Sequence, residues 1–413
     1  MNEFKLSESP FQNNAAAPEV FLEGGHGAYE NTRRVLSHVD LSKAAGKRVL
    51  LKPNAGRMAH PGSGINTNPL AVAAAIDVFR EAGAEVALGE SPITGVKTPD
   101  AFEITGIAEE ARKRNCPLID MDARKFVEVD LPEGIAISRI KMCPDILDFD
   151  LVVSIPVMKM HMHTGVTLGV KNMKGCLWRR SKVVLHMLPP VEGRDEKPLD
   201  IAISDMSFAL RPHLTIVDGS TGMEGIGPSA GVPKSLDVAL VGADAYATDA
   251  VACALMGTAA EKIPHLKIGA ERGYGCIDLD KIRVFPDDWR RWTSAFATPP
   301  TDISIGFPEF EILDVNSCSA CQSSLLLFLK GYGERVLTYF PEGERVKVAI
   351  GKGHELLPEG TLCIGNCTSK SADNGTFVKG CPPVGSEILR AVTGSPVIDV
   401  KDANPEDVDG TDD

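Results

Sequence analysis

The chain has 413 residues, of which 43% are apolar and 24% charged, so it can build two or three domains with buried cores. A net charge of −13 opposes nucleic-acid binding, because a phosphate backbone is bound through clustered Lys and Arg. The polar start lacks a secretory signal, and no window holds the roughly 18 apolar residues needed to span a membrane. We therefore predict a cytoplasmic globular protein without nucleic-acid or membrane partners.

The first part of the chain predicts an α/β body over residues 19–295, preceded by a flexible start at residues 1–18. An apolar strand at 48–53, a helix at 69–82 and a strand at 85–88 form a βαβ unit, which favours a parallel sheet. The alternation continues with further helices and strands, expected at 100–115, 117–120, 151–157, 214–218, 238–241 and 245–256. We expect an α/β body with a parallel or mixed sheet, arranged as two lobes.

The pattern breaks between Trp289 and Pro308, where Trp and Pro residues stand in an irregular segment. We place the domain boundary there. Residues 305–400 then predict a small α/β cysteine-rich domain, and residues 401–413 a flexible tail.

Five of the ten cysteines lie between Cys318 and Cys381. Cys318-Ser-Ala-Cys321, Cys367 and Gly380-Cys381-Pro382 can supply four thiolates from loops, as a 4Fe–4S cluster requires. Cys363 lies inside an apolar strand and is interpreted as a core thiol. The predicted cluster ligands are therefore Cys318, Cys321, Cys367 and Cys381, with a structural zinc site and a redox dithiol as alternatives.

A second group of polar residues follows the strand that ends at Val157. Residues 159–186 are rich in Lys and His, which can hold an anion, ligate a metal or transfer protons. The candidate acid/base or metal groups are Lys159, His161, Lys171 and His186, and the candidate substrate-binding groups are Asn172 and Lys174. A solvated basic loop is the alternative.

A third group surrounds the Gly-rich stretch 219–231, which can cradle an anion on backbone N–H groups. Asp218 precedes it, Glu224 lies within it, and Asp249 follows on a predicted helix. All three are candidate substrate-binding residues. Because parallel strands end at one sheet edge, we expect His161, Lys171 and His186 to share a pocket with Asp218 and Glu224.

These motifs in combination resemble a family known only as domain of unknown function 362. The resemblance rests on KPN at 52–54, KMH and GVTLGVKNMKG within 159–175, MEGIGPSAG at 223–231 and GADAYATDAVA at 242–252. Many members of that family carry iron–sulfur-type cysteines. A more distant similarity, to nickel-pincer lactate racemases, rests on the order and spacing of His161, Gly165, Lys171 and His186. It implies a polar cleft that could hold a second metal, nickel or another.

We therefore expect an iron–sulfur redox enzyme of anaerobic metabolism that acts on a small anionic substrate in a His/Lys-lined cleft. An all-cysteine ligand set leaves no open iron position, so electron transfer is the expected role of the cluster. One alternative is a non-catalytic electron-transfer or accessory protein that docks an electron-transfer partner. Another is a nickel-dependent racemase or epimerase with a structural cluster.

Overall fold

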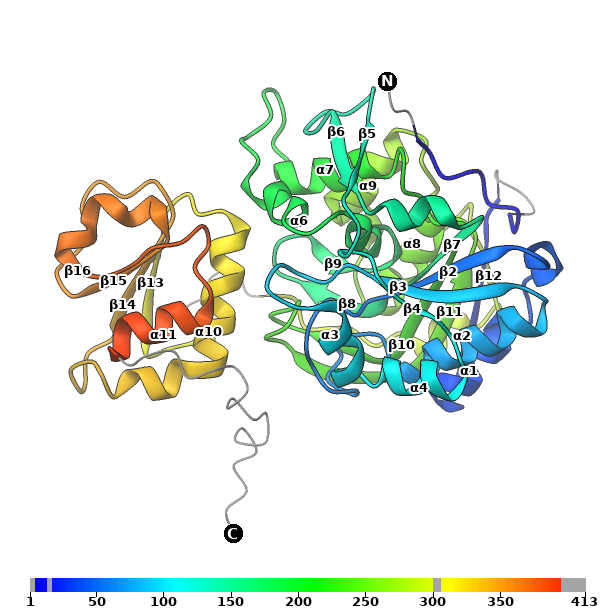
Figure 1. The fold of residues 1–413 in the computed structure, drawn as a ribbon, viewed down its shortest axis with the longest axis horizontal. Coiled ribbons are helices and arrows are strands. Elements are labelled where there is room, and N and C mark those ends of the chain that lie inside the picture. The colour runs from blue at the N-terminus through cyan, green and yellow to red at the C-terminus, as the bar shows by residue number, and fades with distance from the viewer. Residues whose placement is uncertain (1–3, 13–16, 300–305, 395–413) are drawn as a thin grey trace, which may run out of the picture. The chain divides into compact units, whose positions relative to one another are not determined.

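The computed structural model describes residues 4–12, 17–299 and 306–394 (Figure 1). The chain divides into two compact units, Met1–Pro299 and Pro300–Asp413. The first unit is the body and the second is the cysteine-rich unit. Both are α/β, as the alternation of elements predicts.

The body is built on one ten-stranded sheet: eight strands follow the order β12-β1-β11-β10-β7-β2-β3-β4, β8 pairs with β10, and β9 pairs with β8. The central pairs β10–β7, β7–β2, β2–β3 and β3–β4 are parallel, whereas β11 pairs antiparallel with both β1 and β10. The strands are β1 (Glu19–Gly24), β2 (Arg48–Pro53), β3 (Glu85–Glu90), β4 (Leu118–Asp120), β7 (Leu151–Ile155), β8 (Val157–His161), β9 (Gly165–Thr167), β10 (Leu214–Glu224), β11 (Val232–Gly242) and β12 (Arg283–Phe285). A separate ribbon joins β5 (Val127–Asp130) to β6 (Arg139–Met142).

Helices cover both faces of this sheet, because the central strands are apolar on both sides. Along β2, Leu50 points into one core cluster, and Val49 and Leu51 point into the other. The helices are α1 (Gly27–Leu36), α2 (Pro69–Glu81), α3 (Thr98–Ile104), α4 (Ile107–Lys113), α5 (Gly169–Asn172), α6 (Ser181–Val184), α7 (Pro198–Met206), α8 (Ala245–Leu255) and α9 (Pro264–Glu271). Buried residues of α1, α2 and α4 belong to one cluster, and those of α7, α8 and α9 to the other.

The structure differs from the sequence expectations at three places in the body. The helix expected at 100–115 is divided into α3 and α4 by Gly106, whose positive φ of 74° interrupts a helix. The strand expected at 151–157 is divided at Pro156 into β7 and β8. The two expected lobes are not separate units, because ten strands between Glu19 and Phe285 form one sheet within a single compact unit.

The Gly-rich stretch after Asp218 is a further difference, because its first part continues strand β10 to Glu224 and only residues 225–231 form a turn before β11. β10 pairs with β11 as a long hairpin, with a register shift between Gly219 and Thr221. A Cβ at Gly222 would lie 2.4 Å from the carbonyl oxygen of Met158 on β8. Glycine is therefore needed there for close packing of β10 against β8.

The start of the chain packs against the body where the structure describes it. The Leu6 N–H donates to the Ala209 carbonyl at 3.0 Å, and Leu6 and Phe11 are buried. Ser7 Oγ lies 2.8 Å from Nε2 of His213. Residues 4–12 therefore do not have the loose attachment expected of them; their apolar side chains bind them to the core.

The cysteine-rich unit contains a four-stranded parallel sheet in the order β13-β14-β15-β16. Its elements are β13 (Phe310–Asp314), α10 (Ser319–Leu337), β14 (Val346–Ile350), β15 (Thr361–Ile364), the 3-10 segment η8 (Asn366–Asn374), β16 (Gly375–Val378) and α11 (Gly385–Thr393). Alternate residues of β15 point to opposite faces: Leu362 and Ile364 pack with the helix-covered core, and Cys363 packs on the other side. The predicted tail at 401–413 lies outside the described residues.

Candidate functional site

The four predicted cluster cysteines lie in segments that follow the carboxyl ends of parallel strands. Cys318 and Cys321 start α10 after β13, Cys367 follows β15, and Cys381 follows β16. In a parallel sheet these ends meet at one edge, which is where sites form in open α/β folds. The topology therefore brings three separate segments, and four thiols, to one edge of this sheet.

The electrostatics of the thiols show that they lie near one another. A hydrogen bond from Cys321 lowers the pKa of Cys318 to about 6, against the effect of burial, and backbone N–H groups at the start of α10 lower it further. The pKa of Cys321 is raised by this hydrogen bond, by burial, and by the charges of Cys318, Cys367 and Cys381. A Cβ at Gly365 would lie 3.4 Å from Sγ of Cys321, so a small residue keeps the backbone close to the thiols.

Cys363 has a different environment. It is fully buried beside Ala349 and Leu357, and its Sγ lies 3.6 Å from the Thr361 carbonyl and 3.7 Å from the Ser371 carbonyl. Burial raises the pKa of this thiol. Its side chain therefore lies on one face of the sheet, whereas Leu362, Ile364 and Cys321 pack together on the other face.

Within residues 4–12, 17–299 and 306–394, no group of three or more His, Cys, Asp or Glu side chains is arranged to hold a single metal ion. The four thiols fit a cluster by their chemistry, because each thiolate of a cubane binds a different iron. Cys367 and Cys381 are exposed, Cys318 is half-buried and Cys321 is buried, so an inserted cluster would be partly open to solvent.

In the body, the structure brings the predicted basic residues together. His161 ends β8, and its ring centroid lies 5.5 Å from that of His163, which in turn lies 6.2 Å from that of His186. Nε2 of His186 contacts Nζ of Lys174, and the Lys171 Nζ donates to Thr167 Oγ1 at 3.2 Å. We call the set the basic cluster, and its members are Arg57, Lys159, His161, His163, Lys171, Lys174 and His186.

The charges of the basic cluster act on one another. Burial, followed by the charge of Lys171, lowers the pKa of His161 well below its usual value. The pKa of Lys171 is lowered by burial and then by Lys159, and that of His186 by burial and then by Lys174. Desolvation and like charges both disfavour the protonated forms, so these groups are poised to exchange protons or to accept a negative charge.

Two members of the basic cluster were missed at the level of sequence. His163 stands two residues after His161, so a signal was present in the spacing. Arg57 lies in the loop after β2. Burial has the largest effect in lowering the pKa of Lys159, Lys171 and His186, and the charge of Arg57 lowers each of them further. Its position five residues after Lys52, past a strand end, is the only local indication of a role.

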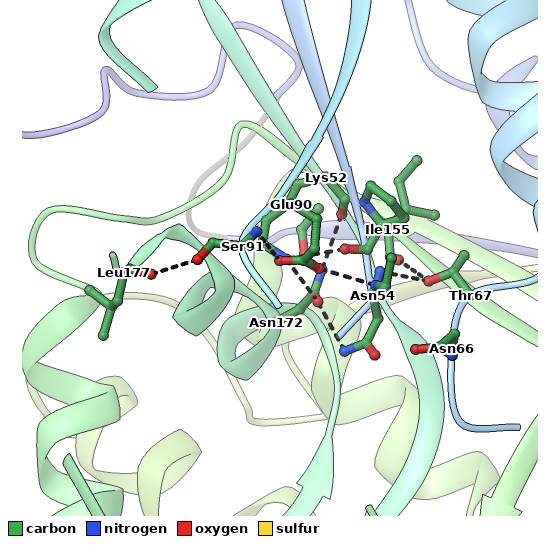
Figure 2. A network of polar contacts seen from close by, with 12 residues as sticks. Lys52, Asn54, Asn66, Thr67, Glu90, Ser91, Ile155, Asn172 and Leu177 are labelled. Atoms are coloured by element: carbon green, nitrogen blue, oxygen red, sulfur yellow. Dashed lines mark hydrogen bonds and ion pairs between the residues drawn. The ribbon is translucent and has the colours of Figure 1, made fainter. Parts of the chain in front are cut away.

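A buried ion pair supports this edge of the sheet (Figure 2). The Lys52 Nζ lies 2.9 Å from Glu90 Oε2 and 3.3 Å from Asn172 Oδ1. Asn54 joins this network to the basic cluster, because its Nδ2 donates to Asn172 Oδ1 at 3.2 Å and its Oδ1 lies 3.4 Å from the Lys159 Nζ. The KPN segment therefore joins β2 to β3, α5 and β8.

Asn172, a predicted substrate-binding residue, is fully engaged with the protein. Its Oδ1 accepts from Lys52 and Asn54, and its Nδ2 donates to Ser154 Oγ at 3.0 Å and to the Lys52 carbonyl at 3.1 Å. A side chain with all of these partners positions the strand ends. Of the two predicted binding residues Asn172 and Lys174, only Lys174 belongs to the basic cluster, where its Nζ contacts His186.

The three acidic candidates are bound to protein groups outside the basic cluster's side chains. Asp218 accepts from the Asn68 N–H at 2.7 Å and from Ser220, and burial raises its pKa. Glu224 pairs with Lys234 at 2.9 Å. The shared pocket of acids and bases expected from the sequence is therefore only partly assembled: the bases meet, and these carboxylates do not face them in any contact of the described residues.

Asp249 has a clear structural role. Its carboxylate accepts from the Gly169 N–H at 2.7 Å and from the Val170 N–H at 2.9 Å. These are the first N–H groups of α5, so Asp249 on α8 fixes the segment that carries Lys171. Burial raises the pKa of Asp249 to about 7.

The fold and the site define the body as an α/β domain with a basic cluster at the carboxyl edge of its sheet. Residues 49–254 match the family described as "Domain of unknown function (DUF362)", which confirms the resemblance seen in the sequence. We therefore class this segment of the chain as a DUF362 domain. It contains every residue of the basic cluster.

Known proteins similar to the chain include the following two. The thylakoid-associated protein sll1697 of Synechocystis sp. is 29% identical over 206 residues, which are 50% of this chain and 62% of that protein. The chain therefore matches less than two thirds of that relative's length. The lactate racemase apoprotein from Thermoanaerobacterium thermosaccharolyticum aligns with 86% of this chain and 75% of its own, at 13% identity and a TM-score of 0.39. Among the described residues, no helix is both long and apolar enough to cross a membrane.

Proposed function

We propose that this protein is an iron–sulfur redox enzyme that carries a 4Fe–4S cluster on Cys318, Cys321, Cys367 and Cys381. The observation that carries the proposal is the convergence of these four thiols from three strand ends and the start of a long helix. The backbone N–H groups that stabilise the Cys318 thiolate are suited to the negative charge of a thiolate-bound cluster. When bound, the cluster supplies or accepts single electrons.

The body is the proposed site of substrate binding. Its basic cluster, held in place by the Lys52–Glu90 pair and by Asp249, supports binding of a small anion, with His161, Lys171 and His186 as groups that hold or move protons. Ten free cysteines fit a reducing compartment such as the cytoplasm. An electron-transfer protein is the proposed redox partner.

Two matched Cys-to-Ser variants test the ligand assignment. We expect Cys363→Ser to keep the iron, the acid-labile sulfide and the broad absorption near about 400 nm after anaerobic purification. Cys367→Ser should lose all three, because it removes a proposed cluster ligand, whereas Cys363→Ser removes only a thiol of the core. Equal losses in the two variants, or loss in Cys363→Ser alone, would reject the ligand set.

The same metal analysis tests the second-metal expectation in the body. Nickel present in stoichiometric amount, and lost in His161→Ala but not in Cys367→Ser, would favour the isomerase alternative. Stoichiometric zinc in a colourless protein would replace the iron–sulfur proposal with a structural zinc site.

A further inference from the structure

The basic cluster contains basic side chains that have no acidic partner, of which Lys159 and Lys171 are buried and Arg57 and Lys174 half-buried. None of Arg57, Lys159, Lys171 and Lys174 has a carboxylate oxygen within ion-pair distance in the described part of the chain. The Lys159 Nζ donates to the Ile65 carbonyl at 2.6 Å, and the Lys171 Nζ uses a threonine hydroxyl. Lysines elsewhere at this edge do have acids: Lys52 pairs with Glu90 at 2.9 Å, and Lys182 lies 3.8 Å from Asp122.

The acids that act on the cluster are already committed to other partners. Glu90 raises the pKa of Lys159 against the larger effect of burial, but its carboxylate is held by Lys52. Asp200 acts in the same way on Lys171, and its carboxylate lies 3.3 Å from Nδ1 of His265. Burial without a counterion lowers the pKa of Lys159 and Lys171, so these lysines can take up protons together with a negatively charged ligand.

Arg57 provides the group best suited to bind such a ligand. Its backbone is fixed on both sides by Asn66, whose Oδ1 accepts from the Arg57 N–H at 3.3 Å and whose Nδ2 donates to the Arg57 carbonyl at 2.9 Å. Its guanidinium donates to no acceptor in the described residues. A fixed backbone with a free guanidinium fork matches the bidentate recognition of a phosphoryl or carboxylate group.

We infer that the basic cluster binds a ligand bearing a phosphoryl group, which Arg57 clamps and Lys159, Lys171 and Lys174 neutralise. A phosphoryl group carries about two negative charges and three acceptor oxygens, so it can accept from Arg57 and favour the protonated form of more than one lysine, whereas a single carboxylate carries one charge and two oxygens. This inference rests on the proposed function, since it names the class of the anionic substrate or cofactor at the same site. The carboxyl edge of a parallel sheet is also a common place for phosphate groups.

Isothermal titration calorimetry of the anaerobically purified full chain tests the inference, with pyrophosphate, inorganic phosphate, malonate and acetate as probes. We expect pyrophosphate and phosphate to bind more tightly than malonate, and acetate not to bind. Arg57→Gln should weaken pyrophosphate binding by about tenfold or more, because it removes charge-assisted hydrogen bonds. Arg57→Lys keeps the positive charge but loses the two-pronged guanidinium, so its affinity for pyrophosphate should lie between those of the wild type and Arg57→Gln.

Arg34→Gln is the matched control, because it removes the same charge from an exposed helix position and should change the affinity less than about twofold. Binding should also take up protons, seen as heats that differ between buffers, because an anion favours the protonated lysines. Absence of pyrophosphate binding, tighter binding of malonate, or equal losses in the Gln variants of Arg57 and Arg34 would overturn the inference.

Cluster loss and ligand loss can be separated in this experiment. Cys367→Ser should be colourless yet retain pyrophosphate binding, and Arg57→Gln should keep the iron and sulfide. A brown protein that fails to bind pyrophosphate would refute the phosphoryl site alone. A colourless wild-type protein that binds pyrophosphate would refute the cluster alone.

Discussion

Replacing Lys52 by Met should destabilise the body strongly. The side chains of Lys52 and Glu90 are 0% and 3% exposed, so the change leaves a buried carboxylate without its cation. Breaking such a pair costs about 3–5 kcal/mol. Glu90 keeps the Ser91 N–H at 2.8 Å and the Ala55 N–H at 3.1 Å, which places the expected loss near the lower end, about 3 kcal/mol.

Urea unfolding monitored by tryptophan fluorescence measures this loss in the body alone, because all three tryptophans lie within residues 1–299. The double variant Lys52→Met, Glu90→Gln should be more stable than Lys52→Met, since the unpaired charge is gone. Arg34→Met is the control: its partner Glu30 is exposed, and such a pair contributes about 0.3–0.5 kcal/mol. A loss in Lys52→Met no larger than in the control would refute the reasoning.

Two further changes test the packing and the titration of the body. A Cβ at Gly175 would lie 2.2 Å from the Glu90 carboxylate, so Gly175→Ala should lower the free energy of unfolding by about 1–3 kcal/mol in the same urea assay. Gly56→Ala is the control, because a Cβ there has nothing within 4 Å, and it should cost less than about 0.5 kcal/mol. Equal losses in the two variants would contradict the close contact at Gly175. Burial lowers the pKa of His213 below 6.5, and its Nδ1 accepts the Val152 N–H at 2.9 Å. The unfolded chain therefore takes up a proton first, and stability should fall as the pH drops below about 6.5, by up to about 1.4 kcal/mol per pH unit for this group. His213→Gln should reduce that slope, and an unchanged slope between about pH 7 and pH 5 would count against the assignment.

Local patterns in the sequence predict the elements that carry the sites. The apolar run at 48–53, the helical spacing from Pro69 and the strand after Gly83 all appear in the fold as β2, α2 and β3. The placement of Cys363 in an apolar strand and of Cys367 after a turn also agrees with the side chains in the structure. These features depend on periodicity and turn residues within about ten positions of one another.

What the sequence did not predict depends on contacts between distant segments. The Gly-rich stretch after Asp218 has the composition of a turn, but its pairing with β11 and its close approach to Met158 extend it as a strand. Asp218 accepts a hydrogen bond from Asn68, which precedes it by 150 residues, and no local pattern indicates that partner. Arg57 gains a role only because a loop after β2 reaches β8 and α5.

Iron and acid-labile sulfide, measured together on the full chain after anaerobic purification, test the central claim most directly. The account predicts about four irons and about four sulfides for each chain, held by Cys318, Cys321, Cys367 and Cys381. A protein that contains neither iron nor sulfide under these conditions, or one zinc ion in their place, would contradict it.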